Sequence, residues 1–352
     1  MLDDTAIEEA RRQAQICNAC RYCEGYCSVF PALHAQRVMA DGDIVQLANL
    51  CHNCQNCFDA CQYTAPHEFD LNLPGILAEV RQESWEETAF PAALGRSFHR
   101  NGTLIAMAAV VAMAALFALL RALPGGGEGF YAMLSHGAMV AIFLPAFVFP
   151  LVALGVGLKR YWSRVGGERI RLGHLRAAFA SAAQMRNLAG GHGKGCNFED
   201  GDRFSQGRRV MHQLVMYGFL LCFAATTAGT ILHYVFDMPA PYALFSLPKL
   251  LGLSGGILLC IGTLGMMRLK LRSRPDLQFP PVRRGEFGFI LLLFIVSASG
   301  LALYAGGGTT ALGALLALHL GAVLAFFLLT PYSKMAHGFY RFAALVRDAQ
   351  RR

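Results

Sequence analysis

Six apolar segments between residues 103 and 330 constrain the fold of this chain more than any other feature of its sequence. A transmembrane helix needs about 20 consecutive apolar residues, and each segment reaches or approaches that length. Only 15% of the 352 residues are charged, against about 25% in soluble domains. The sequence therefore predicts a mainly α-helical protein with a six-helix transmembrane bundle. The six segments are Thr103–Leu120, Phe130–Leu158, His212–Phe236, Leu250–Met267, Phe287–Tyr304 and Ala311–Thr330.

The distribution of Lys and Arg predicts how the bundle is oriented. Short loops rich in basic residues stay on the cytoplasmic side of a membrane. The connection 159–211 holds 11 basic residues, the loop 268–286 holds six, and the residues after Pro331 hold five. The alternate loops hold only Arg121 and Lys249. We therefore expect a bacterial inner-membrane protein with both termini in the cytoplasm. The net charge of +8 then reflects topology and not nucleic-acid binding, because no nucleic-acid-reading motif accompanies it.

Eight of the 11 cysteines form two runs of identical spacing, C-x2-C-x2-C-x3-C, between residues 17 and 61. In two-cluster ferredoxins, three thiolates of such a run bind one [4Fe-4S] cluster and the fourth binds the other cluster. The runs therefore predict a helical, ferredoxin-like head that holds two clusters. Cluster 1 would take Cys17, Cys20, Cys23 and Cys61, and cluster 2 would take Cys51, Cys54, Cys57 and Cys27.

Structural zinc is the alternative for these cysteines. Zinc sites combine two separated C-x2-C pairs, and a third cysteine at the same spacing fits that pattern poorly. The runs also depart from the bacterial ferredoxin pattern, in which a proline follows the fourth cysteine. Here Ser28 follows Cys27 and Gln62 follows Cys61, so we expect the packing around the fourth ligands to differ.

Histidines in or next to the apolar segments are candidate haem ligands, because an imidazole in hydrocarbon is costly unless it is paired or liganded. His212 and His233 lie 21 residues apart, about 5.8 helical turns, and so share a helix face. His319 and His337 lie 18 residues apart, about five turns, and share another. Two stacked bis-histidine haem b sites follow, one pairing His212 with His337 and one pairing His233 with His319. His136 is the reserve for His233. The alternative is that these side chains only form hydrogen bonds between helices.

Two stretches of sequence carry a family resemblance. The segment Ala317–Gly321 and the following Phe326–His337 resemble the haem-binding helix of the nitrate reductase gamma subunit. The chain as a whole resembles the tricarballylate utilization protein B family, also called citrate utilization protein B. This similarity covers the cysteine runs, the segment Gly190–Asp200, and Arg208–His212 with Tyr217–Phe219 after it. The resemblance implies a partner, a soluble FAD-dependent tricarballylate dehydrogenase on the cytoplasmic side. Electrons from its reduced FAD would pass through the clusters and haem to the quinone pool.

The expected organisation has four parts. A ferredoxin-type domain covers 1–80, a linker covers 81–102, the bundle covers 103–337 with the cytoplasmic loop 159–211, and a basic cytoplasmic tail covers 338–352. No catalytic side chain is expected, because the cofactors supply the chemistry. Two alternative functions are electron transfer for a different flavin dehydrogenase or a heterodisulfide-reductase-like enzyme, and redox sensing in the membrane. The loop with Cys196 is expected to pack against the head or the flavoprotein.

Overall fold

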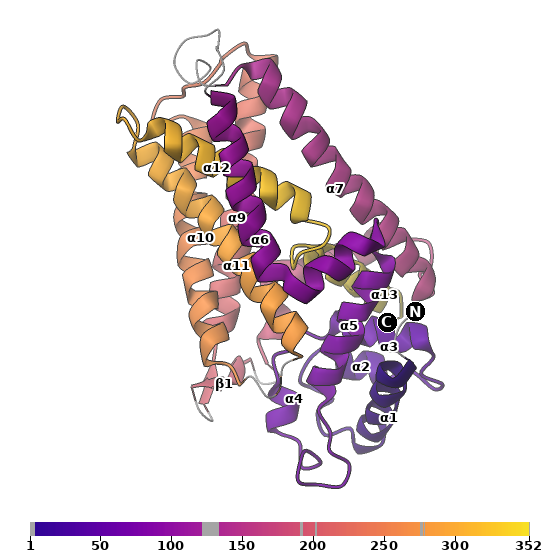
Figure 1. Ribbon diagram of the computed structural model, residues 1–352. Coiled ribbons are helices and arrows are strands. Elements are labelled where there is room, and N and C mark those ends of the chain that lie inside the picture. The colour runs from indigo at the N-terminus through magenta and orange to yellow at the C-terminus, as the bar shows by residue number, and fades with distance from the viewer. Residues whose placement is uncertain are drawn as a thin grey trace.

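The computed structural model describes residues 4–121, 134–190, 193–200, 203–274, 277 and 279–351. The fold is mainly α-helical, as predicted, with a small helical head below a bundle of long helices (Figure 1). The head contains α1 (Asp4–Cys20), α2 (Val29–His34), α3 (Asp41–Leu50), α4 (Asn56–Asp59) and α5 (Leu73–Thr88). The bundle contains α6 (Ala92–Arg121), α7 (His136–Arg164), α9 (Gly207–Val235), α10 (Leu247–Arg272), α11 (Pro280–Ala305) and α12 (Leu312–Leu329). The remaining elements are α8 (Leu172–Gln184), η2 (Arg186–Leu188), the antiparallel strands β1 (Cys196–Asp200) and β2 (Arg203–Ser205), and α13 (Ala336–Arg351).

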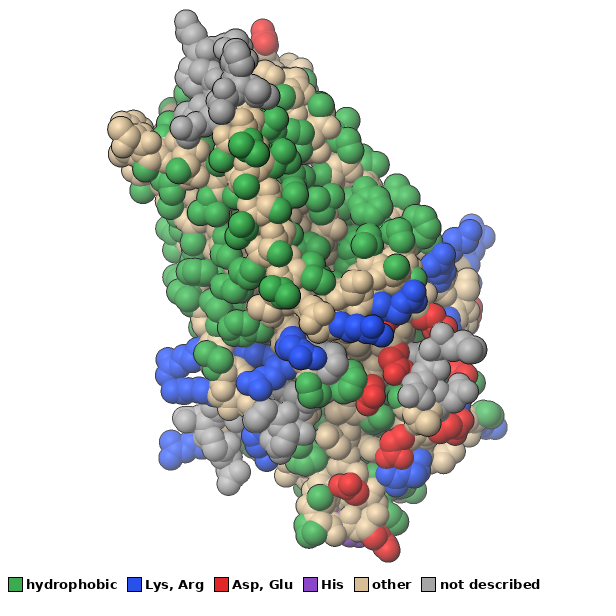
Figure 2. Space-filling model, in the orientation of Figure 1, with side chains coloured by type: hydrophobic (Ala, Val, Ile, Leu, Met, Phe, Trp, Pro, Cys, Tyr) green, Lys and Arg blue, Asp and Glu red, His purple; other side chains and the backbone are tan. Residues whose placement is uncertain are grey.

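The described residues contain six helices that are long and apolar enough to cross a membrane, which confirms the predicted number of spans. They correspond to α6, α7, α9, α10, α11 and α12. The first few residues of the predicted second segment lie outside the described residues. Figure 2 shows apolar side chains covering the bundle and a band of Lys and Arg where the bundle meets the head. This architecture fits a multi-pass membrane protein.

Small residues let α9 and α10 approach each other closely. A Cβ added at Gly218 would lie 2.7 Å from the backbone nitrogen of Leu259 and 2.9 Å from the carbonyl oxygen of Gly255. Any larger residue at this position would push the two helices apart. Close backbone contact through small residues is a common way for membrane helices to associate without a hydrophobic driving force.

The stretch expected as a linker, 81–102, is helical in the structure. It holds the end of α5 and the first turns of α6, which kinks at Asn101 (φ −136°, ψ 36°). The Trp85 indole nitrogen donates to the Oδ1 atom of Asn49 at 2.8 Å, and His99 Nδ1 lies 3.1 Å from a carboxylate oxygen of Glu86. Packed helices therefore connect the head to the bundle.

The basic tail expected at 338–352 also differs, because it forms α13 and packs against α3, α7 and α8. Ala336, Tyr340 and Ala344 recur every four residues on its buried face, the spacing of an amphipathic helix. Gln46 joins three elements, since its amide donates to the carbonyl of Ala344 at 2.8 Å and its Oε1 atom accepts from the Tyr161 hydroxyl at 2.7 Å. The head, the end of α7 and α13 share one core.

Candidate functional site

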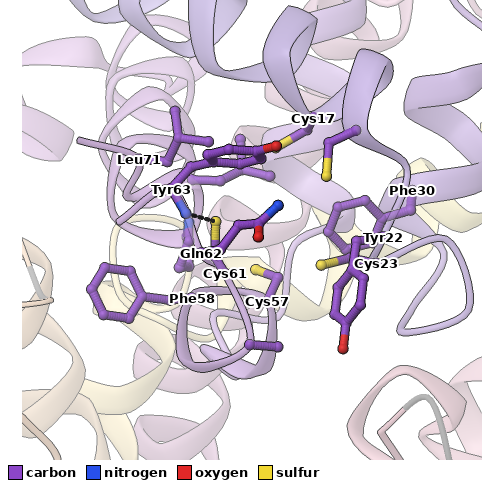
Figure 3. Close-up of a pocket in the computed structure, with 14 residues that line it drawn as sticks. Cys17, Tyr22, Cys23, Phe30, Cys57, Phe58, Cys61, Gln62, Tyr63 and Leu71 are labelled. Atoms are coloured by element: carbon purple, nitrogen blue, oxygen red, sulfur yellow. Dashed lines mark hydrogen bonds between the residues drawn. The ribbon is translucent and has the colours of Figure 1, made fainter. Parts of the chain in front are cut away.

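The four cysteines of predicted cluster 1 line one pocket of the head, with a volume of about 230 Å³ (Figure 3). Cys17 and Cys20 lie in the last turn of α1, Cys23 lies in the turn that follows, and Cys61 lies just after α4. The backbone N–H of Tyr63 donates to the sulfur of Cys61 at 3.4 Å. Burial, together with the neighbouring thiols, raises the pKa of Cys17 and that of Cys23 to about 12. The thiolate forms therefore need the positive charge of a metal centre to be stable here.

The four cysteines of predicted cluster 2 line a second, much narrower pocket. Cys57 belongs to the walls of both pockets, so the two cysteine groups are adjacent. The backbone N–H of Asn53 donates to the sulfur of Cys51 at 3.4 Å. A hydrogen bond from Cys196 lowers the pKa of Cys54 to about 6, against the opposing effect of burial. This pocket thus holds one thiol that ionises readily and lies under the loop that carries Cys196.

Cys57 lines the first pocket together with the four cysteines predicted for cluster 1, and the four predicted for cluster 2 line the second. In the part of the chain that the structure describes, no three His, Cys, Asp or Glu side chains converge on a single-ion site. A [4Fe-4S] cubane takes one thiolate at each of four irons, so its ligands stand further apart than those of one ion. The ligand sets themselves remain a prediction.

The structure explains why Ser28 stands where ferredoxins carry a proline. The backbone N–H of Ser28 donates to Asn187 Oδ1 at 3.1 Å, and Asn187 Nδ2 donates to the Ser28 hydroxyl at 2.8 Å. A proline has neither a backbone N–H nor a hydroxyl. Both side chains are buried, so this reciprocal pair ties η2 to the residue next to Cys27.

The loop with Cys196 packs against the head. Cys196 is 1% exposed and lies in a small apolar cluster with Met185, Leu188 and Cys54. The Asn56 side chain donates to the carbonyl of Gly195 at 3.0 Å. The loop therefore covers the second cysteine pocket.

A larger cavity of about 570 Å³, which we call the histidine cavity, lies where the bundle meets the head. Its walls come from α7, α9, α10, α11 and α12, from the start of α13, and from the head loop with His52 and Asn53. The rings of His212 and His337 lie in this wall with their centroids 5.8 Å apart and their planes at 83°. Two imidazoles from distant parts of the sequence thus face the same space.

The ring nitrogens of these two histidines suit metal ligation. Nδ1 of His337 is hydrogen-bonded to the carbonyl of Lys334, which leaves Nε2 as the free nitrogen, as in most metal-bound histidines. Nδ1 of His212 is buried without a hydrogen-bond partner. Burial, with the nearby cations of Lys334 and Arg341, holds the pKa of His337 well below its usual range. His337 is therefore neutral, the form that binds metals.

Charged side chains surround the head-facing end of the histidine cavity, and the sequence analysis missed their role. Glu286 in α11 pairs with both Lys270 and Lys334. Arg341 bonds the carbonyl of Cys51 at 2.5 Å and lies 3.0 Å from Nδ1 of His52. The sequence does contain a signal of this charged cluster, because Lys270, Glu286 and Lys334 stand near the ends of predicted apolar segments. Which of these charges pair with one another could not be identified without the fold. The other cations of this wall are Arg81 and Arg208.

The structure gives the other candidate histidines different neighbours. His233 stacks on His136, with ring centroids 4.5 Å apart, and His136 Nε2 lies 2.8 Å from the Tyr234 hydroxyl. His319 instead lies against α11, with Nδ1 3.1 Å from the Ser299 hydroxyl. The predicted pair of His233 with His319 is therefore not formed, and His136, the reserve for His233, lies against His233 instead.

Comparisons with known proteins agree with this architecture. The family model described as "Citrate utilization protein B" matches residues 96–352. A second, described as "Citrate utilization protein B Fer4-like domain", matches residues 10–87. The chain belongs to the citrate utilization protein B family. This result confirms the family that the sequence motifs indicated.

The citrate utilization protein B assignment extends along nearly the whole chain. The "Citrate utilization protein B" of Escherichia coli is 42% identical over 350 residues, which cover 97% of this chain and 91% of the relative. No solved structure matches the chain. A Fer4-like head joined to six apolar helices indicates an iron-sulfur electron-transfer protein of the membrane.

Proposed function

We propose that this protein carries electrons from a soluble flavin dehydrogenase through two [4Fe-4S] clusters to a haem b in the membrane and on to the quinone pool. One observation carries the proposal. The loop from Cys51 to Cys57 lines the second cysteine pocket, and its residues His52 and Asn53 also line the histidine cavity. A single short loop therefore separates the cysteines from the histidines, as a relay between the two sites requires.

The residues of the histidine cavity fit a haem. His212 and His337 would be its axial ligands, because each has a ring nitrogen that lacks a hydrogen-bond partner in the protein and both rings line the histidine cavity. Phe147, Phe219 and Phe289 contribute apolar wall, and the volume of 570 Å³ lies within the range of about 300–1,000 Å³ for cofactor sites. Arg208 and Arg341 would meet the propionates. When bound, haem supplies one-electron chemistry at a potential set by its ligands and surroundings.

The first cysteine pocket is the proposed place where electrons arrive. Cys20 is exposed and Tyr22 is 69% exposed beside it, whereas Cys51 is buried. A flavoprotein docked on this surface would reach cluster 1 before cluster 2. The family resemblance favours a tricarballylate dehydrogenase as the partner, and the relative's name points to citrate utilization.

The same arrangement supports an inner-membrane location with both termini in the cytoplasm. The band of Lys and Arg lies where the bundle meets the head (Figure 2), and basic residues favour the cytoplasmic side. Both ends of the chain lie near the head (Figure 1). A cytoplasmic dehydrogenase could then reach cluster 1.

Spectra of ligand variants test the proposal. Dithionite-reduced membranes should show b-type haem bands that His212→Ala and His337→Ala each remove and the matched variant His174→Ala, in α8, leaves intact. Low-temperature EPR should lose one cluster signal in Cys20→Ser and the other in Cys54→Ser. Unchanged haem bands in both histidine variants, or both EPR signals in either cysteine variant, would refute the assignment.

A further inference from the structure

A second membrane cavity, of about 300 Å³, lies between α9, α10, α11 and α12. We call it the His319 cavity, because that residue contributes the one imidazole among the described residues that line it. The hydroxyls of Thr226 and Ser297 in its wall donate to carbonyls of their own helices. Nζ of Lys249 lies 4.5 Å from the ring centre of Tyr304. Lys249 can only donate hydrogen bonds, so His319 is the group of this wall that can offer an acceptor nitrogen to a ligand.

Hydrogen bonds fix which nitrogen of His319 is available. The Ser299 hydroxyl donates to the carbonyl of Val296 at 3.2 Å, so its oxygen accepts from Nδ1–H of His319 at 3.1 Å. This tautomer leaves Nε2 with a lone pair that can accept a hydrogen bond. Gly300 makes room for the ring, since a Cβ there would lie 2.9 Å from the Cε1 atom of His319.

The His319 cavity adjoins the histidine cavity. The two share five apolar wall residues, so one layer of side chains separates them. These residues are Phe219, Phe223, Leu293, Phe326 and Phe327. A ligand in one cavity therefore lies close enough to exchange electrons with a cofactor in the other.

The surroundings of the His319 cavity select a lipid-soluble ligand. The His319 cavity lies between four of the helices that are apolar enough to cross a membrane, and its wall residue Phe223 is 46% exposed. We therefore expect a ligand to reach the cavity from the region that lipid would occupy. Membrane hydrocarbon admits apolar molecules and disfavours charged ones. A ligand with an apolar ring and one or two oxygen atoms matches both the walls and the single imidazole.

We infer that the His319 cavity binds the head group of an isoprenoid quinone, with Nε2 of His319 accepting a hydrogen bond from a hydroxyl of the quinol form. This inference rests on the proposed function, which supplies the electrons. A quinone that takes two electrons from the relay, one after the other, and two protons from water becomes the quinol: its two C=O double bonds become C–O single bonds, two O–H bonds form, and no single bond breaks. His319 is thus a quinone-binding residue and not a haem ligand.

The reverse reaction tests this assignment in the purified, cofactor-loaded protein. Anaerobic menadiol, a soluble naphthoquinol, loses two electrons and two protons and reduces two ferric haems, which stopped-flow absorbance follows directly. In His319→Leu we expect the haem content per chain and its reduction by dithionite to stay unchanged. Reduction by menadiol should slow about tenfold, the effect of losing one hydrogen bond at the reacting group, because leucine has no acceptor atom. The matched variant His174→Leu should behave as wild type.

Three outcomes separate the possible failures. Loss of haem from His319→Leu would make His319 a haem ligand and overturn the inference, as would an unchanged rate with menadiol. Wild-type protein without haem would instead refute the proposed function. If His319→Leu does not accumulate, Gly300→Ala gives the same readout, because the added methyl displaces the imidazole without removing it. A wild-type rate in that variant would equally overturn the inference.

Discussion

Replacing Glu286 by Gln tests the electrostatics where the bundle meets the head. The Glu286 side chain is 16% exposed and pairs with Lys270 and Lys334, which are 14% and 20% exposed. The variant keeps the shape of the side chain but, at a pH below 7 where Lys334 is protonated, leaves two cations facing each other in a poorly solvated place. Removing one partner of a buried ion pair costs about 3–5 kcal/mol. We expect about 3 kcal/mol, because both ammonium groups keep some contact with solvent.

Thermal unfolding of the detergent-solubilised protein measures this loss. A melting temperature falls by about 2–4 °C per kcal/mol in larger domains, so the variant should melt several degrees below wild type. The matched variant Glu87→Gln removes the partner of Arg164 in a more exposed pair and should cost about 0–1 kcal/mol. A triple variant with Lys270→Met, Glu286→Leu and Lys334→Met should recover most of the lost stability, since apolar side chains of similar volume replace buried ion groups well. A variant Glu286→Gln as stable as wild type would refute this reasoning.

Three further predictions concern stability, packing and redox potential. Burial lowers the pKa of Lys334 from 10.5 to about 7, so between these pH values the unfolded chain binds more protons than the folded protein. The free energy of unfolding should therefore rise with pH from about 7 to 10, and unfolding curves of Lys334→Met should lose that slope. Asn187→Ala should lower the free energy of unfolding by about 2–3 kcal/mol, because it leaves the buried N–H and hydroxyl of Ser28 unpaired. The amide hydrogen of Ser28 should then exchange faster with solvent, and an unchanged exchange rate would contradict the prediction. Cys196→Ala should lower the potential of cluster 2 by tens of mV, because hydrogen bonds to the sulfurs raise cluster potentials, and an EPR redox titration should find cluster 1 unchanged.

The six spans could be predicted because their signal is local, and the assignment of the cysteines to two clusters rests on an equally local signal. An apolar run of about 20 residues defines a span without reference to the rest of the chain, and the cysteine spacing defines which thiols can share a cluster. The amphipathic spacing of Ala336, Tyr340 and Ala344 was also present in the sequence, but the high charge of 338–352 favoured an exposed tail. Only the surfaces of α3, α7 and α8 show what the apolar face of α13 covers.

The histidine pairs and the polar junction needed the fold. Helical phase predicts which residues share a face of one helix, but the neighbouring helix decides what that face meets. His212 lies near His337, but the single helix assumed for His319 and His337 is broken, because α12 ends at Leu329 and His337 belongs to α13. The packing of α7 brings His136 to His233. Glu286 lies one residue before the predicted fifth segment and meets Lys270 and Lys334 only after α10, α11 and the turn between α12 and α13 pack together.

Chemical analysis of the purified protein tests the central claim most directly. Iron, acid-labile sulfide and haem should be measured per chain after anaerobic purification from membranes. Two cubanes and one haem predict about nine irons, eight sulfides and one haem, since each cubane contains four irons and four sulfides. Protein that contains zinc, and neither sulfide nor haem, would contradict the account.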